Sequence, residues 1–308
     1  MKPFKESDWR VDPKDFKIDE SRDFIKAGYQ DIYFCTQKTT GYKCVMKKTN
    51  CILKDQNMKR AYDRNIYTLA TVDHPAIVPF VGFYEKDDYG FSIEEEIEKG
   101  DLLHLLKDKM KGHIEPLFDD THKLIIAYGI SHAMKYLHEH RIINRDLKTP
   151  NVLLDSELHP YLTDFGTSKI IHQSIQISQT LLQSTTPPYM APEFIIEPER
   201  YSNSFPIDVY SFGITLYELI TETLLFSHFR NTFKLFVAVT SGQRPGIPSS
   251  VPSNWKELIT ACWAQEPGDR PTFAEICDIL ESDVFVNDSI DRQVFEDYKR
   301  IIHSANHV

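Results

Sequence analysis

The chain has 308 residues, of which 41% are hydrophobic and 26% are charged. This composition is typical of a globular protein and excludes a fibre or a disordered chain. The 35 basic and 45 acidic residues give a net charge of −10, which disfavours nucleic acid and anionic membranes as partners. At this length the chain can bury a sizeable core, as one large domain or two lobes, without a disulfide or metal to hold it.

The cysteines do not form the short-spaced pairs typical of zinc sites. There are five of them: Cys35, Cys44, Cys51, Cys262 and Cys277. A zinc site built from the first three is one interpretation, but buried thiols in a reducing compartment are favoured. The sequence has no apolar run of membrane-spanning length and no signal-peptide core at its start. We therefore expect a cytoplasmic protein, with the nucleus as the alternative.

The first hundred residues predict a small β-rich lobe. Residues 32–35 and 42–46 flank a turn at Gly41, as in a hairpin. Another strand is predicted by apolar residues at even spacing: Phe91, Ile93 and Ile97. One helix is predicted between these strands by apolar residues at helical spacing: Met58, Tyr62, Ile66 and Leu69.

After about Gly100 the sequence predicts a larger, mainly helical lobe. Apolar residues recur at three- and four-residue intervals over residues 122–138, 207–222 and 272–281. Beyond Ser282 the same spacing continues at Ile290, Val294, Tyr298 and Ile301. We expect this tail to pack on the helical lobe, with a partner-binding helix as the alternative. The fold class is α+β with two lobes, and a cleft between such lobes is a natural small-molecule site.

Three motifs in the helical part carry chemistry: Ile-Asn-Arg-Asp-Leu-Lys-Thr-Pro-Asn at residues 143–151, Asp-Phe-Gly at 164–166 and Ala-Pro-Glu at 191–193. Phosphoryl transfer needs positioning and charge neutralisation more than covalent chemistry. Asp146 can accept a proton from the attacking hydroxyl, and Lys148 can neutralise the moving phosphoryl group. Asn151 and Asp164 can hold magnesium ions. These four residues therefore have the types and the order that the reaction requires.

With these motifs the chain resembles the eukaryotic protein kinases, over residues 9 to about 280. The resemblance is closest to the tyrosine-kinase-like group of serine/threonine kinases. It implies a bilobal kinase domain at residues 1–283, with an N-lobe at about 1–97 and a C-lobe at about 98–283. Residues 284–308 would form a C-terminal helical tail. ATP and Mg²⁺ are the implied cofactors.

The same resemblance implies two buried anchors in the larger lobe. Asp208 would hold the backbone of the catalytic loop, and Arg270 would form an ion pair with Glu193 below the substrate-docking loop. Asn144 stands where the family has a histidine that packs beneath the catalytic loop. This substitution indicates a softened support and not a lost reaction.

The implied substrate is a protein serine or threonine. Lys148 is typical of serine/threonine kinases, and Thr186 occupies the place that would brace Asp146 and Lys148. Phosphorylation is an expectation for the segment that precedes Thr186, where Arg145 could bind a phosphate; ordinary polar loop residues are the alternative. The candidate positions are Ser168, Ser174, Ser178, Thr180 and Ser184.

The ATP-binding part of the small lobe departs from the family. Lys47 matches the lysine that holds the α- and β-phosphates, and Val45 stands in place of the alanine above the adenine. Ile32 and Leu153 are the other apolar residues expected at the nucleotide. Of the glycine-rich loop only Gly28 remains, because three glycine positions carry other residues: Ile25, Ala27 and Gln30. Their side chains would keep the loop further from the phosphates.

The glutamate that should pair with Lys47 is also missing. Its place on the predicted helix is taken by Asn65, and Asp63 lies about 200° round that helix. We hypothesise that Glu94, at the gatekeeper position, supplies the missing charge, with Glu95 and Ile97 offering backbone groups to adenine. The alternative register makes Ile93 the gatekeeper.

Two functions follow from these observations. The first is an active serine/threonine protein kinase with an atypical ATP-binding lobe. The second is a pseudokinase, which binds nucleotide or acts as a scaffold in signalling. An acidic interaction domain without nucleotide is a third, more remote alternative. We expect a protein substrate, no nucleic acid and no membrane partner, with a regulatory partner at the tail as an option; the sequence leaves the oligomeric state open.

Overall fold

The computed structural model describes residues 4–27, 30–50, 52–165, 169–170, 186–225 and 231–304. It divides into two units. The first comprises residues 1–73 and 77–98, and the second comprises residues 74–76 and 99–308. Within the described part of the chain, no helix combines the length and the apolar character needed to cross a membrane.

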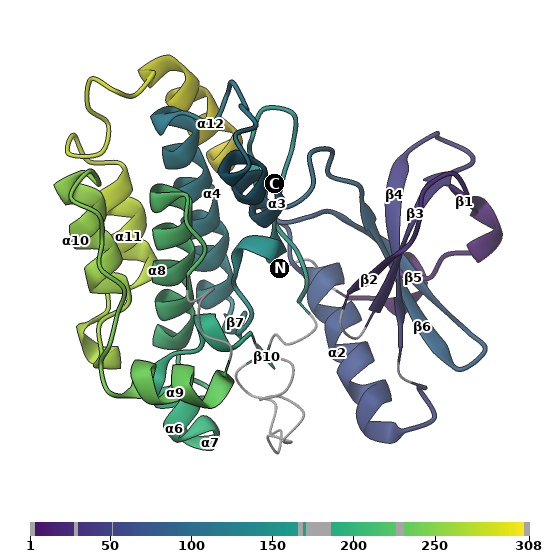
Figure 1. The fold of residues 1–308 in the computed structure, drawn as a ribbon. Coiled ribbons are helices and arrows are strands. Elements are labelled where there is room, and N and C mark those ends of the chain that lie inside the picture. The colour runs from purple at the N-terminus through teal and green to yellow at the C-terminus, as the bar shows by residue number, and fades with distance from the viewer. Residues whose placement is uncertain are drawn as a thin grey trace. The chain divides into compact units, whose positions relative to one another are not determined.

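The first unit is built on one antiparallel sheet of six strands (Figure 1). The strands are β1 (Phe16–Ile18), β2 (Ile25–Ala27), β3 (Gln30–Gln37), β4 (Lys43–Thr49), β5 (Phe80–Lys86) and β6 (Tyr89–Glu95). Their order is β1-β3-β4-β6-β5, and β2 also pairs with β3. The predicted hairpin is confirmed as β3 and β4. The predicted strand at Phe91 is β6, but it ends at Glu95, so Ile97 lies beyond it.

The strand register sorts the side chains of β4 and β6 onto two faces. Cys44 and Met46 of β4 and Ile93 of β6 are buried in one apolar cluster, together with Phe16 and Cys35. Because side chains alternate along a strand, the intervening residues of β4 and β6 point to the other face. The even positions of β4 thus build the core, and the odd positions are available for a site.

One long helix, α2 (Gln56–Thr71), accompanies this sheet. Tyr62 and Ile66 of α2 are buried with Phe83 of β5. The Tyr62 ring lies against Gly90 so closely that a Cβ atom at Gly90 would collide with it, and the Tyr62 hydroxyl donates to the Phe91 carbonyl at 3.0 Å. The helix predicted from Met58 to Leu69 is confirmed. Before the sheet lie a short helix, α1 (Glu6–Trp9), and a 3-10 turn, η1 (Pro13–Asp15).

The second unit is mainly helical (Figure 1). Its described helices are α3 (Leu102–Met110), α4 (Asp120–Glu139), α6 (Pro192–Ile196), α7 (Pro198–Tyr201), α8 (Pro206–Thr221), α9 (Thr232–Thr240), α10 (Ser253–Cys262), α11 (Phe273–Leu280) and α12 (Arg292–Ser304). Short strands form two pairs, β7 (Ile142–Ile143) with β10 (Lys169–Ile170) and β8 (Val152–Leu154) with β9 (Pro160–Leu162). The 3-10 turns are η2 (Thr149–Asn151), η3 (Pro187–Tyr189) and η4 (Pro267–Asp269).

The ends of these helices follow from local capping. Asp119 accepts a hydrogen bond from the His122 amide and starts α4, and Thr272 with Glu275 forms a capping box at the start of α11. Such side chains satisfy amides that have no partner inside the helix. The helices predicted at 122–138, 207–222 and 272–281 are therefore confirmed within two residues at each end.

The C-terminal helix α12 packs on α4, as the first of the two interpretations expected. Its buried residues are Phe295, Tyr298 and Ile302, whereas Val294 is 37% exposed and Ile301 is 44% exposed. The prediction was thus wrong for Val294 and Ile301, because the next residue along the chain is the buried one in each case. At Gly129 of α4 an added Cβ would collide with the Tyr298 hydroxyl, so this glycine allows the two helices to approach closely.

Candidate active site

Lys47 lies on the face of β4 that points away from the apolar cluster of Cys44 and Met46. Its ammonium Nζ is 2.7 Å from Oε2 of Glu94 in β6, and the two side chains are 9% and 2% exposed. In the register, Lys47 is opposite Ser92 and Glu94 is opposite Val45, so the pair is diagonal across neighbouring strands. Long side chains can meet at that separation. The hypothesis that Glu94 supplies the missing charge agrees with this ion pair.

The alternative register is excluded by burial. Ile93 has no exposed surface and belongs to the apolar cluster on the other face of the sheet. Lys48, the neighbour of Lys47, also points away from the pair, with its ammonium 4.3 Å from the centre of the Tyr89 ring. Glu94 and Lys47 are therefore the buried charged pair of this face.

The helix α2 does not provide a carboxylate there. Asn65 stands at the predicted position, and its Oδ1 atom is buried without a hydrogen-bond partner among the described residues. Asp63 forms a surface ion pair with Lys59. The amide of Asn65 thus does not replace the glutamate that the family has on this helix.

The residues expected around the nucleotide base are placed as follows. Val45 and Ile32 are half-buried on β4 and β3. Glu95 ends β6, and its amide donates to the Pro79 carbonyl at 3.0 Å, so its carbonyl is the group it can offer. Ile97 follows the strand. Gly28 lies outside the described residues, and so does Cys51.

The catalytic loop of the second unit holds Asp146 in a polar network. Lys148 Nζ donates to Asp146 Oδ2 at 2.7 Å and to Thr186 Oγ1 at 2.8 Å. Asn151 Nδ2 donates to the same carboxylate oxygen at 2.9 Å. Thr186 Oγ1 lies 3.5 Å from the other oxygen, Oδ1. The bracing role expected for Thr186 is present in this geometry.

The electrostatics of Asp146 suit a proton acceptor. Burial raises the pKa of Asp146 to about 6, the neighbouring Lys148 opposes this rise, and the negative charge of Asp164 adds to it. A general base works best when its pKa lies close to the operating pH. The carboxyl group is therefore ionised at neutral pH but retains useful basicity.

The donor set beside Asp146 fits Mg²⁺. Asn151 uses its amide nitrogen for both hydrogen bonds to Asp146, which leaves the carbonyl oxygen as the atom that can bind a cation. Asp164 contributes a carboxylate close enough to raise the pKa of Asp146. Magnesium prefers such oxygen ligands. Leu153 of β8 is half-buried between the buried Val152 and Leu154.

Two backbone positions near this network have unusual conformations. Asp164 has φ = 63° and Arg145 has φ = 68°, in the left-handed region that disfavours residues with a side chain. Such positions cost of order 1–3 kcal/mol and concentrate at functional sites. Gly166 lies outside the described residues.

The catalytic loop is fastened from below by Asp208, as expected. Its carboxylate has no exposed surface and accepts hydrogen bonds from the amides of Asn144 at 2.9 Å and Arg145 at 2.8 Å. The Asn144 side chain in turn accepts from the Asp146 amide at 3.0 Å. Sequence reasoning missed His138, whose Nε2 lies 2.9 Å from Asp208 Oδ2. Its position at the end of the helix before the loop was the available signal.

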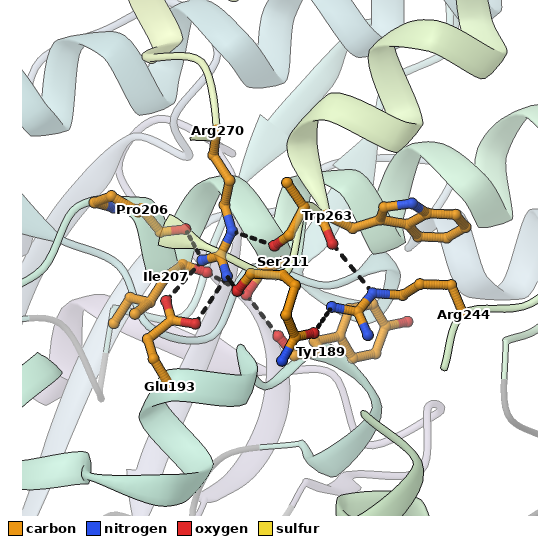
Figure 2. A network of polar contacts seen from close by, with 10 residues as sticks. Tyr189, Glu193, Pro206, Ile207, Ser211, Arg244, Trp263 and Arg270 are labelled. Carbon is orange, nitrogen blue, oxygen red and sulfur yellow. Dashed lines mark hydrogen bonds and ion pairs between the residues drawn. The ribbon is translucent and has the colours of Figure 1, made fainter. Parts of the chain in front are cut away.

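A second buried network supports the segment that follows Thr186 (Figure 2). Arg270 donates from both terminal nitrogens to Glu193, at 2.7 and 2.8 Å, which is the expected ion pair. Figure 2 also shows Arg244, which sequence reasoning missed; it donates to the Trp263 carbonyl at 3.1 Å. Ser211 Oγ donates to the Tyr189 carbonyl at 2.8 Å.

Glu218 was also missed. It is a buried acid of α8 that accepts hydrogen bonds from Tyr189 at 2.5 Å and from Thr149 at 2.9 Å. Burial raises its pKa, and its hydrogen bonds oppose this effect. An acidic residue among the apolar residues of the last turns of α8 was the signal in the sequence. Glu218 connects the catalytic loop to the segment around Tyr189.

The role expected of Arg145 as a phosphate ligand is not visible in this arrangement. Its guanidinium is buried, and Nη2 donates to the Ser202 carbonyl. The candidate phosphorylation positions, Ser168, Ser174, Ser178, Thr180 and Ser184, lie outside the described residues. Phosphate binding by Arg145 stays a prediction.

Comparison with known proteins agrees with this geometry. The protein kinase domain family matches residues 27–281. The chain belongs to the protein kinase family. It is 37% identical to a probable LIM domain-containing serine/threonine-protein kinase of Dictyostelium discoideum, over 71% of this chain and 32% of that protein. The serine/threonine-protein kinase STY17 of Arabidopsis thaliana is 30% identical, over 89% of this chain and 45% of its own length.

A third relative is the Arabidopsis serine/threonine/tyrosine-protein kinase HT1, which is 32% identical over 82% of this chain and 62% of its own length. The resemblance to the tyrosine-kinase-like group of serine/threonine kinases is confirmed by these similarities. The bilobal kinase fold is likewise confirmed. This chain spans about a third to three fifths of the length of these relatives.

Proposed function

We propose that this chain is an active serine/threonine protein kinase, which transfers the γ-phosphoryl group of ATP to a protein hydroxyl. The observation that carries this proposal is the position of Asp146, which is held at once by Lys148 and Asn151 and has a pKa of about 6. A residue held in this way is ready to accept a proton from an attacking hydroxyl. The domain proposed for this activity is residues 1–283, with 284–308 as an accessory tail.

We assign the cofactors ATP and Mg²⁺ to the residues whose chemistry fits them. Bound Mg-ATP supplies the phosphoryl group and the cations that neutralise its negative charge. Asn151 and Asp164 provide oxygen ligands for Mg²⁺, and Lys47 provides an ammonium for the phosphates. The base is assigned to Ile32, Val45, Leu153, Glu95 and Ile97, with Gly28 at the phosphates.

The two lysines of the proposed site, Lys47 and Lys148, are each held in place by neighbouring side chains. Glu94 pairs with Lys47 at 2.7 Å in a buried position and so holds its ammonium in place. Thr186 and Asp146 together hold the Lys148 ammonium, so this charge is fixed before a substrate binds. Fixed charges stabilise a transition state without first having to reorganise.

Serine and threonine are the favoured acceptors. Beside Asp146 the second unit has a pocket lined by apolar and polar residues, among them Thr186, Met190, Phe194 and Ile207. Lys148 donates to Asp146 and to Thr186, the arrangement typical of serine/threonine kinases, and this supports a serine or threonine hydroxyl as the group presented to Asp146. The protein substrate itself is a matter for experiment.

The second candidate is a pseudokinase that binds nucleotide or acts as a scaffold. The observation that favours it is the loss of glycine at Ile25, Ala27 and Gln30, since β2 and β3 extend to these positions as regular strand. The oxygen and nitrogen groups around Asp146 favour the enzyme, because a scaffold has no need of them.

One assay distinguishes these functions. Phosphate incorporation from labelled Mg-ATP into a generic protein substrate is measured for the chain and for an Asp146→Asn variant. We expect incorporation by the former and at most a trace by the latter; equal signals would refute the enzyme. A rise in melting temperature with Mg-ATP but without turnover would support the pseudokinase.

A further inference from the structure

The second unit contains a cluster of side chains with metal-ligand chemistry that includes none of the catalytic residues. His132, Glu281 and His303 each place one ligand atom within 4.8 Å of the other two, and this is the one group of three or more His, Cys, Asp or Glu residues with such geometry in the described part of the chain. The three residues come from three elements: α4, the position after α11, and the last turn of α12.

The buried member of this cluster is available as a ligand. His132 is 8% exposed, and its Nε2 atom has no hydrogen-bond partner within the described residues. The nearest charged atom is Oε1 of Glu281 at 3.7 Å, which is beyond hydrogen-bonding distance. A buried polar atom without a partner is costly unless something binds to it.

The two exposed members are held together by a tyrosine. The Tyr128 hydroxyl donates to Glu281 Oε1 at 2.8 Å and lies 3.1 Å from His303 Nε2. The Tyr128 ring also packs on the His132 ring, with centroids 4.2 Å apart. Tyr128 is one helical turn before His132 on α4, so it touches all three members. Residues that orient metal ligands in this way are a regular part of metal sites.

The spacing and the ligand types point to zinc. In a tetrahedral Zn²⁺ site, ligand atoms at about 2.0–2.1 Å from the metal lie about 3.4 Å from one another. The 3.7 Å between His132 and Glu281 is close to this value. Two histidines and one carboxylate suit Zn²⁺, whereas Mg²⁺ and Ca²⁺ prefer oxygen ligands. Lys299 lies 3.1 Å from Glu281 Oε2 and also pairs with Glu296 at 3.2 Å. Glu296 therefore remains as a partner for Lys299 when Glu281 binds a metal.

We propose that His132, Glu281 and His303 bind one Zn²⁺ ion, which links α12 to α4 and to the end of α11. The fourth ligand is water, because Glu281 and His303 are exposed. The ion would fasten the C-terminal helix, which otherwise meets α4 through ring packing and through the contact of Tyr128 with His303. The site is separate from the magnesium ligands Asn151 and Asp164, and it needs neither ATP nor catalysis.

The test is a calorimetric titration of the full chain with Zn²⁺ after treatment with a chelator. We expect one bound ion that depends on all three residues. His303→Ala and Glu281→Gln change exposed side chains, so both variants should fold, and each should weaken Zn²⁺ binding at least about tenfold. Tyr128→Phe, which removes only the hydroxyl, should weaken binding by roughly 10–100-fold.

The matched control is His104→Ala. His104 is an exposed histidine that pairs with Asp101 at 2.7 Å in α3, and its removal should leave Zn²⁺ binding unchanged. Co²⁺ in place of Zn²⁺ should show the visible absorption of a tetrahedral site in the unsubstituted chain and lose it in His303→Ala. Zn²⁺ binding that is absent, that persists in His303→Ala and Glu281→Gln, or that disappears only with Asp164→Asn would overturn the proposal.

Discussion

The carboxylate of Glu94 lies 2.7 Å from the ammonium of Lys47, and both belong to the same sheet. In protein kinases the lysine is generally paired with a glutamate of the helix beside the sheet, and movement of that helix switches the pair on and off. Here β4 and β6 hold both partners. The position of Lys47 should therefore be independent of the position of α2.

This relationship predicts the effect of Glu94→Gln. The substitution keeps the shape of the side chain but removes the negative charge beside a buried ammonium, so Lys47 keeps an acceptor and loses its ionic partner. We expect kcat/KM for ATP to fall at least about tenfold, equivalent to about 1.4 kcal/mol. The matched control is Glu96→Gln, whose partner is the surface residue Arg22; it should retain full activity.

A second substitution tests the mechanism of this loss. In the Glu94→Gln background, Asn65→Glu returns a carboxylate to the position on α2 where the family has one. We expect this double variant to recover part of kcat/KM for ATP. If Glu94→Gln has no effect, or if it lowers activity through unfolding as seen by circular dichroism, the role assigned to Glu94 is wrong.

The ion pair between Arg270 and Glu193 predicts a large effect on stability. Arg270→Ala leaves Glu193 buried without its partner, which typically costs about 3–5 kcal/mol of the free energy of unfolding. Urea denaturation measures this change. The control is Arg200→Ala, because Arg200 and Glu197 form a surface pair with side chains 71% and 49% exposed; its unfolding curve should coincide with that of the unsubstituted chain.

A double-mutant cycle separates the pair from other contacts of Arg270. The loss in the Arg270→Ala, Glu193→Ala double variant should be smaller than the sum of the two single losses. Additive losses would mean that the backbone carbonyls bound by Arg270, at Ala264 and Pro206, account for its contribution.

The hydrogen bonds of Asp208 predict a defect in catalysis. In Asp208→Asn, one carboxylate oxygen becomes an NH₂ group that faces the amides of the catalytic loop, so at least one donor loses its acceptor. We expect kcat to fall at least about tenfold, whereas KM for ATP changes little. Steady-state kinetics at varied ATP concentrations distinguish the two parameters.

The control for this variant is Asp155→Asn. Asp155 also accepts hydrogen bonds from loop amides, those of Glu157 and His159 at 2.9 Å, but in the turn between β8 and β9. It should lower stability without lowering kcat. A normal kcat in Asp208→Asn would contradict the assigned role of Asp208 in holding the loop.

His74 predicts how stability depends on pH. Burial, together with the charges of His132 and His303, lowers the pKa of His74 to about 3. In the unfolded chain the pKa is about 6.5, so below this pH the unfolded state binds more protons than the folded state. Stability is therefore complete above pH 6.5 and is lost as the pH falls toward 3. The contribution of His74 to this loss is about 2 kcal/mol at pH 5.

Urea denaturation at pH 7 and pH 5 tests this expectation. The difference in the free energy of unfolding between the two pH values should be smaller in His74→Asn, since asparagine does not titrate. Equal pH dependence in His74→Asn and the unsubstituted chain would show that other groups cause the loss.

The sequence suggested the pairing of Lys47 with Glu94 because one missing carboxylate matched one unexpected carboxylate, and strand alternation selected Lys47 over Lys48. The resemblance to the protein kinase family predicted that Asp208 holds the catalytic-loop backbone and that Arg270 pairs with Glu193. The prediction that Val294 and Ile301 of α12 are buried was wrong. Residues at the border of the apolar face of a helix are buried or exposed according to the neighbouring element, which the sequence of the helix alone does not show. His132, Glu281 and His303 had no common motif, because only the packing of three helices brings them together.

The approach of Tyr298 to Gly129 has a practical consequence for anyone who shortens this chain. The matched family segment ends at residue 281, eleven positions before α12 starts. A fragment cut there would lack α12, which packs on the rings of Tyr128 and His132 and against Gly129. The apolar surface left uncovered would promote aggregation. At the other end, a cut at residue 27 would remove Phe16 and Val11 from the cluster on the sheet. The smallest stable fragment should thus be longer than the matched family segment at both ends.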